Sequence, residues 1–184
     1  MSWDNKNILE VLKKNGVVVM PTDTLYGIVG KAEKASVVER VYTIRKRNTN
    51  KPCIILIGNI NELEKFSIHT SQEQKTAIKK YWSGAVSIIL ECPEEKFAYL
   101  HRGTKTLAFR IPAQKELQNL LKETGPLVAP SANPEGLPPA ENITEAKNYF
   151  GDTVDLYIDG GEIKGKASKV IKLHKDGSVT VIRS

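Results

Sequence analysis

Short apolar runs alternate with amphipathic helical patterns along most of the chain, and this alternation limits the folds open to it. Residues 17–20 form an apolar run that Pro21 ends, and residues 37–44 then carry apolar side chains at helical spacing. Further apolar runs predict strands at residues 53–57, 85–90, 106–111, 127–129, 154–158, 168–173 and 179–182, with a hairpin turn at 175–178. Alternating elements followed by a β-rich tail predict a layered α/β fold with a mixed sheet.

The helices are predicted from their start and stop signals. Asp4 is expected to cap a helix that Gly16 ends, and a second helix is expected to finish at residues 45–47. Asn61 and Ser71 are expected to open two more helices, the latter through a capping box with Gln74. The remaining helices are expected to run from Pro112 to Gly125 and over residues 144–150, with a Pro-rich loop at 131–140 between them.

The composition is that of one soluble globular domain. Hydrophobic residues make up 40% and charged residues 26% of the 184 residues, so extensive disorder is not expected. No apolar run is long enough to span a bilayer and the N-terminus lacks a signal-peptide core, so we expect a cytoplasmic protein without a membrane partner. Cys53 and Cys92 are expected to be buried free thiols, and the scattered histidines predict no metal site.

The charge balance favours a partner that carries phosphate. Lysine and arginine number 27 against 21 aspartate and glutamate residues, which gives a net charge of +6. A positive field attracts either a nucleotide or a nucleic acid, and the net charge does not choose between them. The chain has neither a P-loop nor a G-x-G-x-x-G fingerprint, so a nucleotide would have to be bound by side chains.

Polar side chains crowd the end of the first predicted strand. The segment Pro-Thr-Asp-Thr-Leu-Tyr-Gly at 21–27 combines the hydroxyls of Thr22, Thr24 and Tyr26 with a carboxylate at Asp23. Such hydroxyls can donate to an anion or accept from an amine. They could equally satisfy backbone groups within a local turn, and the segment alone leaves both interpretations open.

A second cluster, Arg45, Arg47 and Lys51, follows the second predicted helix. If the chain is already extended there, Arg45 and Arg47 share a face and could bind phosphate oxygens together. The alternative is that these cations interact favourably with the C-terminus of the helix.

The predicted strand at 106–110 places Thr106, Ala108 and Arg110 on one face and two apolar residues on the other. An arginine in an apolar strand must find a partner or face a cavity, and the small side chain of Ala108 leaves room for a ligand. An edge-strand arginine exposed to water is the alternative.

The later segments add hydroxyl and amide groups. Ser131 and Asn133 lie in a loop after a short strand, where the amide suits a ribose, a base or a polar amino-acid group. Ser131 lacks the surroundings of a catalytic nucleophile. Ser168 and Arg183 gain a functional meaning only if the last strands return to the same cleft.

Taken in order, these segments resemble the YrdC family, the threonylcarbamoyl-adenylate synthases. The resemblance extends from about the first predicted strand to the C-terminus. The matching segments are PTDTLYG at 21–27, RKR-N-x-x-KP at 45–52, WSGAVSIIL at 82–90, LAFRIP at 107–112, PLVAPSANPEG at 126–136, DGG at 159–161, SKV at 168–170 and IR at 182–183.

The resemblance implies a fold and a reaction. It implies a single YrdC-like domain over residues 1–184, an α/β fold with a twisted, mixed and largely open β-sheet flanked by helices and a deep basic cavity. L-threonine, bicarbonate or CO₂, and ATP with Mg²⁺ would give L-threonylcarbamoyl-AMP and pyrophosphate. The product would supply the t6A modification of tRNA through a partner transferase complex, and no protein ligand to the metal is implied.

The resemblance also assigns residues. The threonine end of the cavity would be formed by Thr22, Thr24, Tyr26, Arg110 and Ser168. The phosphates and adenosine would be held by Arg45, Arg47, Lys51, Thr106, Ser131, Asn133 and Arg183, and the catalytic groups would be Arg45, Arg47 and Arg110.

Some positions depart from the family pattern. Arg45 stands where the family commonly has lysine, and Leu56 where many members have histidine. Glu135 stands where serine is usual, and Lys169 where threonine is usual. Residues 83–85 are Ser-Gly-Ala in place of Pro-Gly-Pro.

The chemistry of the implied reaction fits the residue types. The amine of threonine adds to CO₂, and the carbamate oxygen then attacks the α-phosphate of ATP. Two anions must meet, so clustered cations are required while a covalent nucleophile is not. The alternatives are a non-catalytic RNA-binding module with weak tRNA or double-stranded RNA contact, and a related carbamoyl-adenylate activity like that of the homologous domain in hydrogenase-maturation carbamoyltransferases.

Overall fold

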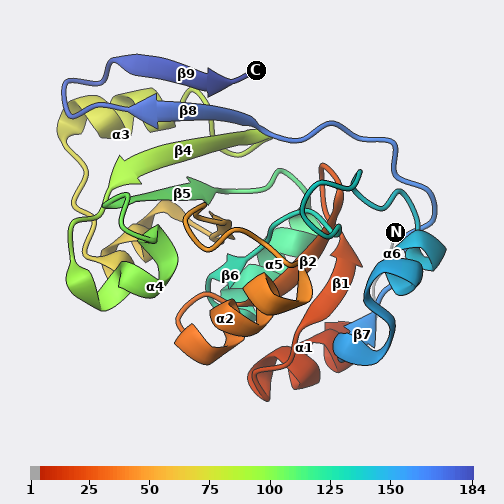
Figure 1. Ribbon diagram of the computed structural model, residues 1–184. Helices are drawn as coiled ribbons and strands as arrows, with labels where there is room; N and C mark the ends of the chain where they lie inside the picture. Colours follow the sequence, from red (N-terminus) through yellow and green to blue (C-terminus); the bar gives the residue numbers. More distant parts are fainter. Residues whose placement is uncertain (1–4) are drawn as a thin grey trace.

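One mixed β-sheet organises residues 5–184, which are the residues that the computed structural model describes (Figure 1). Asp4, the predicted helix cap, lies outside them. Within this range nine strands follow the order β7-β1-β2-β6-β3-β5-β4-β8-β9. The strands are β1 (Val18–Pro21), β2 (Tyr26–Lys31), β3 (Ile54–Leu56), β4 (Val86–Glu91), β5 (Thr106–Arg110), β6 (Leu127–Val128), β7 (Leu156–Tyr157), β8 (Lys169–Leu173) and β9 (Val179–Arg183). Three neighbouring pairs are parallel, β1 with β7, β3 with β5 and β4 with β8, and the others are antiparallel, which confirms the predicted mixed sheet.

Helices lie on both faces of this sheet, and the chain also contains three 3₁₀ helices within residues 5–184. The α-helices are α1 (Asn5–Lys13), α2 (Ala35–Ile44), α3 (Gln72–Ile78), α4 (Ala98–His101), α5 (Lys115–Thr124) and α6 (Ile143–Phe150). The 3₁₀ helices are η1 (Ile60–Phe66), η2 (Glu95–Phe97) and η3 (Gly151–Thr153).

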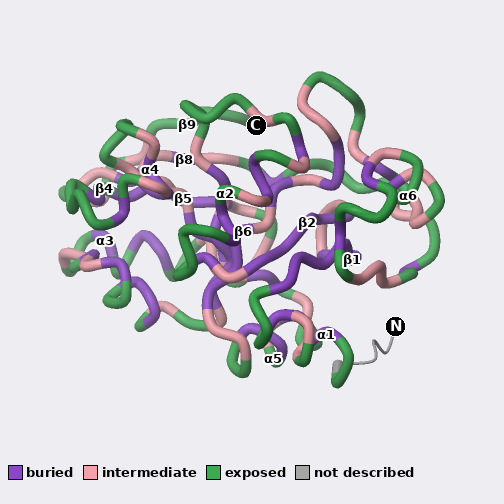
Figure 2. The backbone as a smooth tube through the Cα atoms, turned by 60° about the horizontal axis from the view of Figure 1, so that its bottom comes forward, coloured by how far each residue is buried: buried purple, intermediate pink, exposed green. Residues whose placement is uncertain are grey.

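Side chains on the two faces of the sheet pack into two separate cores, because successive residues of a strand point to opposite faces. Val18 and Met20 of β1 pack with apolar residues of α1 and α5. Val17 and Val19 pack into the larger core on the other face, to which α2, α3 and α6 contribute. Figure 2 shows the result, with buried strands in the middle of the molecule and exposed segments around them.

Several local predictions are confirmed and two helix starts are corrected. Ser71 caps α3 in a capping box with Gln74, as predicted. The helix expected to open at Asn61 is the 3₁₀ helix η1, whose cap is Asn59, because the Asn59 side chain accepts a hydrogen bond from the Asn61 amide. The helix expected from Pro112 begins only at Lys115.

Strand β2 and the short helices η2, α4 and η3 are not predicted from the sequence. Strand β2 contains Gly27 and Gly30, and glycine is depleted in strands, so its pattern resembles a turn. Both glycines mark close approaches of other segments. A methyl group on Gly30 would lie 2.5 Å from Val37 Cγ1, and Gly27 forms an isolated bridge with Ser131.

Strand β5 is a central strand, which decides between the two interpretations of Arg110. It pairs in parallel with β3 on one side and antiparallel with β4 on the other. The edge-strand alternative for Arg110 is therefore wrong. In the register of β3 and β5, Leu56 lies beside Arg110, so Arg110 faces the same side of the sheet as α1 and α5.

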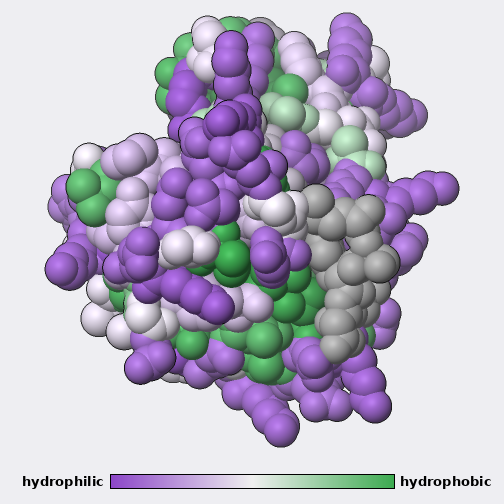
Figure 3. Space-filling model, turned by 90° about the vertical axis from the view of Figure 1, so that its right-hand side faces the viewer, coloured by the Kyte–Doolittle hydropathy of each residue, from purple (hydrophilic) through white to green (hydrophobic). Residues whose placement is uncertain are grey.

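The surface on the side of α6 and β7 is mostly hydrophilic, with a smaller apolar area near its centre (Figure 3). Within residues 5–184, no helix has the length and apolar character needed to cross a bilayer. Cys53 and Cys92 are buried free thiols, as predicted.

Asp155 joins the region before β7 to the start of β1. Its Oδ2 atom accepts a hydrogen bond from the Val17 amide at 2.7 Å and lies 2.6 Å from Arg40 Nη1. The Arg40 guanidinium and the Val17 amide hold the pKa of Asp155 below its ordinary value. A lowered pKa in the folded state stabilises the fold above the ordinary pKa, and this contribution is lost as the pH falls.

We therefore expect Asp155→Asn to lower the free energy of unfolding by up to about 1 kcal/mol at neutral pH, since the ion pair is partly exposed. Asparagine keeps an acceptor for Val17 and loses the charge that Arg40 pairs with. Urea unfolding of both proteins at about pH 7 and about pH 3 measures the difference, which should shrink at the lower pH. An equal difference in the free energy of unfolding at both pH values would contradict the stabilising role given to the charge of Asp155.

Candidate functional site

A cavity of about 530 Å³ lies where the ends of β1, β5 and β6 meet the last strands of the sheet. Among the predicted site residues, those that line it are Thr22, Thr24, Tyr26, Arg47, Thr106, Arg110, Ser131, Ser168 and Arg183. Ser168 and Arg183 thus return to the same cleft as the early segments. Arg45, Lys51 and Asn133 lie outside the cavity wall.

Strand β5 forms one wall as its alternation predicts. Thr106, Ala108 and Arg110 face the cavity, and Leu107 and Phe109 are buried in the larger core. The small side chain of Ala108 leaves space between the two polar residues. Only 4% of Arg110 is exposed, so this guanidinium group needs partners within the protein.

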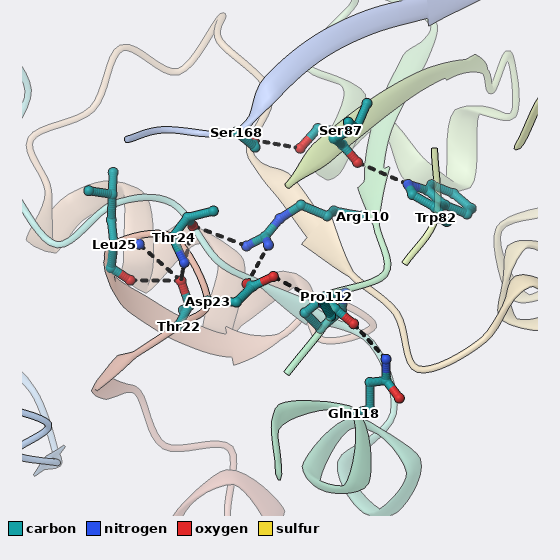
Figure 4. Close-up of polar contacts among 12 residues, drawn as sticks. Thr22, Asp23, Thr24, Leu25, Trp82, Ser87, Arg110, Pro112, Gln118 and Ser168 are labelled. Carbon is teal, nitrogen blue, oxygen red and sulfur yellow. Dashed lines mark hydrogen bonds and ion pairs between the residues drawn. The ribbon is translucent and has the colours of Figure 1, made fainter. Parts of the chain in front are cut away.

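The turn at residues 22–25 supplies those partners. The Thr22 hydroxyl donates to the Leu25 carbonyl at 2.7 Å and accepts from the amides of Thr24 and Leu25, which fixes the turn. Asp23 and Thr24 then point toward the guanidinium group of Arg110 (Figure 4). Asp23 forms an ion pair with Arg110 Nη1, and Thr24 Oγ1 lies 3.4 Å from Arg110 Nη2.

Tyr26 lines the cavity, but its hydroxyl is committed to the connection between β7 and β8. It donates to the Gly161 carbonyl at 2.8 Å and accepts from the Gly160 amide at 2.7 Å. Burial raises the pKa of Tyr26, which keeps the phenol protonated as the donor. If Tyr26 contributes to the threonine end as predicted, it does so through its aromatic ring and by holding Gly160 and Gly161 in place.

The connection over residues 159–168 leads into β8 (Figure 1), and Ala167 and Ser168 at its end line the cavity. A methyl group on Gly165 would lie 1.7 Å from the Thr24 carbonyl oxygen, so the two backbones are in direct contact. At its end, Ser168 Oγ lies 2.9 Å from Ser87 Oγ, and the Ser168 carbonyl accepts from Arg183 Nε and Nη2 at 3.1 and 2.7 Å. The connection thereby joins the turn to the C-terminal hairpin.

Arg47 and Arg183 face the cavity and are held by backbone carbonyls. Arg47 donates to the carbonyls of Lys51 and Pro52 at 3.1 and 2.9 Å, and Arg183 donates to that of Ser168. Within residues 5–184, neither guanidinium forms an ion pair. This part of the cavity therefore carries a positive charge that suits an anion.

Arg45 does not line the cavity, whereas Arg47 does. Helix α2 ends at Ile44, and Lys46 adopts a left-handed conformation with φ 49°, so the two arginines do not lie on one face of an extended segment. Arg45 is 2% exposed and its Nη2 atom donates to Asn133 Oδ1 at 3.2 Å and to Ser131 Oγ at 3.4 Å. Among the described residues, its Nε and Nη1 atoms have no hydrogen-bond partner. Burial, followed by the nearby charge of Arg47, lowers the pKa of Arg45 to about 10.

Lys51 points outward to Glu135. Its ammonium group lies 2.6 Å from Glu135 Oε1, and the second oxygen of Glu135 accepts from the Asn48 amide. These hydrogen bonds lower the pKa of Glu135. Glu135, which stands where the family usually has serine, thus connects the loop after α2 to the loop after β6. Its ion pair with Lys51 lies outside the cavity wall.

Comparison with protein families assigns the chain. The model of the Sua5/YciO/YrdC family, described as telomere recombination, matches residues 10–184. The chain belongs to the Sua5/YciO/YrdC family. The predicted membership of this family is thereby confirmed.

Relatives of this Sua5/YciO/YrdC chain include threonylcarbamoyl-AMP synthases. The enzyme of Bacillus subtilis is 31% identical over 153 residues, which cover 82% of this chain and 44% of the relative. A protein of Methanocaldococcus jannaschii named as a putative threonylcarbamoyl-AMP synthase is 33% identical over 184 residues, which cover 97% of this chain and 86% of the relative. The crystal structure of Pyrococcus abyssi Sua5 complexed with L-threonine superimposes with a TM-score of 0.86 at 27% identity, covering 97% of this chain and 53% of that chain. The chain thus spans about half the length of the Bacillus and Pyrococcus proteins.

Two contacts of this Sua5/YciO/YrdC site were not predicted. The sequence indicates the carboxylate of Asp23 but no partner for it, and it gives no indication of a contact at Gly165. Their partners, Arg110 and Thr24, are far away in the sequence, and no local pattern indicates such pairs. The central place of β5 would have indicated that Arg110 requires a buried carboxylate.

Proposed function

We propose that the chain catalyses the formation of L-threonylcarbamoyl-AMP and pyrophosphate from L-threonine, bicarbonate or CO₂, and ATP. One observation carries the proposal. Arg47, Arg110 and Arg183, from three separate segments, line one cavity together with the hydroxyls of threonine and serine residues. Such a cavity can hold a carboxylate and a triphosphate side by side, as this reaction requires.

The threonine end is assigned to the region around Arg110. A guanidinium group has five N–H donors, and Asp23 and Thr24 engage two of them. The remaining donors can bind the threonine carboxylate. Thr22 and the connection that ends at Ser168 complete this end of the cavity.

The phosphate end is assigned to Arg47, Arg183, Thr106 and Ser131. The carbamate forms when the amine of threonine adds to CO₂ and releases a proton. A carbamate oxygen then bonds to the α-phosphorus of ATP, and the bond to the pyrophosphate oxygen breaks. Arginines whose charge is not already neutralised reduce the repulsion between these anions and stabilise the departing pyrophosphate.

Mg²⁺ belongs to the proposal as the companion of ATP. Within residues 5–184, no group of three or more histidine, cysteine, aspartate or glutamate side chains could hold a metal ion. The metal would therefore be carried by phosphate oxygens and water, as Mg²⁺ commonly is in nucleotide sites. No residue of this chain is assigned to it.

The fate of the product is part of the same proposal. A carbamoyl-adenylate is an activated donor that water hydrolyses, so a transferase must use it promptly. We assign that step to the t6A transferase complex in the cytoplasm, with tRNA as final acceptor. Contact between tRNA and this chain is a further expectation and does not enter the chemical step.

A direct assay tests the activity. The purified protein is incubated with ATP, Mg²⁺, radiolabelled bicarbonate and threonine, serine or glycine in turn. We expect pyrophosphate release that depends on threonine, with the label in a nucleotide adduct. Absence of a labelled adduct under these conditions would overturn the proposal, and salt-sensitive RNA binding that ATP does not affect would favour the RNA-binding alternative.

A matched pair of variants connects this activity to the cavity. Arg47→Gln should lose most of the pyrophosphate release, because it removes one of the cations at the phosphate end. Lys46→Gln removes the same charge one residue away, from an exposed side chain outside the cavity wall, and should keep it. Equal losses in both variants would show that net charge matters and that the position of Arg47 does not.

Arg45 gives a prediction in which stability and binding change in opposite directions. A buried cation with unpartnered donors destabilises the free protein, and replacing it by an apolar side chain of similar length is often neutral or stabilising. We expect Arg45→Met to unfold at the same or a higher temperature than wild type without ligand. Because Arg45 contacts Ser131, which lines the phosphate end, the variant should also show a smaller rise in unfolding temperature with ATP.

Thermal unfolding with and without Mg-ATP measures both quantities. Arg45→Lys, which restores the residue usual in the family, should keep the ATP-dependent rise. If Arg45→Met kept the full rise, Arg45 would have no part in nucleotide binding.

A further inference from the structure

The carboxylate of Asp23 is held at the amino-acid end of the cavity by contacts from two directions. One oxygen forms the ion pair with Arg110 Nη1, and the other accepts from the Ala113 amide at 3.1 Å. The side chains of Arg110 and Asp23 are only 5% and 11% exposed. Their charges are therefore weakly screened by solvent and largely cancel each other.

The turn that carries Asp23 has little freedom. Thr22 binds the backbone of the turn through three hydrogen bonds, with Leu25 O, Thr24 N and Leu25 N. Figure 4 shows Asp23 and Thr24 on the same side of this turn, next to the guanidinium group. The carboxylate is thus a fixed partner of Arg110, which lines the cavity, rather than a mobile surface charge.

The arginines of the cavity fall into two classes. Arg110 has a carboxylate partner, whereas Arg47 and Arg183, among the described residues, donate only to backbone carbonyls. One end of the cavity is close to neutral and the other is positive. An amino acid is a zwitterion without net charge, and phosphate groups are anions, so the two ends differ in the ligands that they favour.

We propose that Asp23 is a specificity-determining residue of the amino-acid end. By neutralising Arg110 it makes this end suitable for a zwitterion and unfavourable for phosphate-like anions, which then bind only beside Arg47 and Arg183. The inference rests on the proposed function for the identity of the zwitterion. The negative charge of Asp23 keeps the triphosphate out of the amino-acid end.

The physical basis is the repulsion between Asp23 and a second anion. An oxyanion bound to the free donors of Arg110 would lie within a few ångströms of a nearly buried carboxylate, where like charges repel strongly. A zwitterionic ligand brings its own positive charge and reduces this repulsion. Removing the charge of Asp23 while keeping its shape should therefore favour simple anions over the amino acid.

Asp23→Asn tests this directly, with inorganic sulfate as the anion probe. In wild type at saturating threonine and limiting ATP, sulfate should inhibit pyrophosphate release by competing with ATP. At saturating ATP, sulfate should compete with threonine in Asp23→Asn, with an inhibition constant about tenfold or more below that of wild type. The KM for threonine should rise, while the KM for ATP stays within about twofold.

Asp159→Asn is the matched control. Asp159 accepts a hydrogen bond from the Gly161 amide, and Gly161 in turn contacts the cavity-lining Tyr26. Within residues 5–184 no ion pair joins Asp159 to Arg110. Asp159→Asn removes one negative charge but leaves the ion pair between Asp23 and Arg110 intact. Inhibition by sulfate should therefore be the same as in wild type. An equal gain of sulfate inhibition in both variants would overturn the proposal in favour of a general effect of net charge.

A binding measurement separates this inference from the proposed function. The rise in unfolding temperature with sulfate, in the presence of a non-hydrolysable ATP analogue, needs no turnover, and it should be larger in Asp23→Asn than in Asp159→Asn. If wild type formed no adduct but this contrast were present, the proposed function would fail and the charge assignment of Asp23 would stand. Asp23→Ser serves the same measurement if Asp23→Asn does not fold, and a missing contrast in the folded variant refutes the assignment.

Discussion

Arg110→Ala is expected to abolish threonine-dependent pyrophosphate release, with kcat/KM falling by about a thousandfold or more. The turn at 22–25 holds this cavity-lining arginine in place through Asp23 and Thr24. Alanine leaves the threonine carboxylate without a cation and leaves Asp23 to repel it. The release of labelled pyrophosphate from ATP at several threonine concentrations measures the loss.

The fold should survive this substitution. Arg110 lines the cavity, so water can enter the vacated space and solvate Asp23, which keeps its hydrogen bond from the Ala113 amide. Arg40→Ala is a matched control, because it removes an arginine that pairs with an aspartate and neither residue lines the cavity. Circular dichroism should match wild type for both variants, and only Arg110→Ala should be inactive. Wild-type turnover by Arg110→Ala would remove Arg110 from the site.

Gly165→Ala is expected to have the second largest effect. The added methyl group would lie 1.7 Å from the Thr24 carbonyl oxygen, so either the connection over residues 159–168 or the turn at 22–25 must move. Both are backbone segments, and forcing an extra methyl group into a packed contact typically costs about 1–3 kcal/mol. Because Thr24 also contacts Arg110, the displacement should disturb the amino-acid end and raise the KM for threonine by about tenfold or more.

Gly84→Ala provides the comparison for this prediction. The atom nearest to its added methyl group would be the Tyr81 carbonyl oxygen at 3.5 Å, an ordinary contact distance. Urea unfolding and steady-state kinetics should show wild-type behaviour for Gly84→Ala. For Gly165→Ala they should show lower stability and an altered KM for threonine with little change in the KM for ATP. An unchanged KM for threonine would mean that the connection does not shape that end.

The sequence predicts the parts of the site that depend on local alternation and misses those that depend on distant contacts. The faces of β5 follow from its period of two, so the alternation alone places Thr106, Ala108 and Arg110 on one wall. Ser168 and Arg183 can be assigned only through the resemblance to the family. Their own segments give no indication that the hairpin returns to the cleft.

The errors have physical causes at particular residues. An extended chain would put Arg45 and Arg47 on one face, but Lys46 is left-handed and only Arg47 lines the cavity. Lysine is not a residue that signals such a turn. Strand β2 is missed because Gly27 and Gly30 resemble turn residues. The packing of Val37 against Gly30 explains why a small residue is needed there, and the sequence alone does not indicate this contact.

The hydrogen bonds of Tyr26 to Gly160 and Gly161 have a consequence for the order of events during synthesis. They join a strand made early to a segment made more than a hundred residues later, as does the pairing of β1 with β7. A ribosome-bound chain that has emerged only as far as α5 contains the turn at residues 22–25. It still lacks the connection over residues 159–168, whose Gly165 contacts Thr24 of that turn. The cavity is therefore complete only after the hairpin of β8 and β9, which carries Arg183, has joined the sheet. Contacts between residues so far apart in the sequence also slow folding.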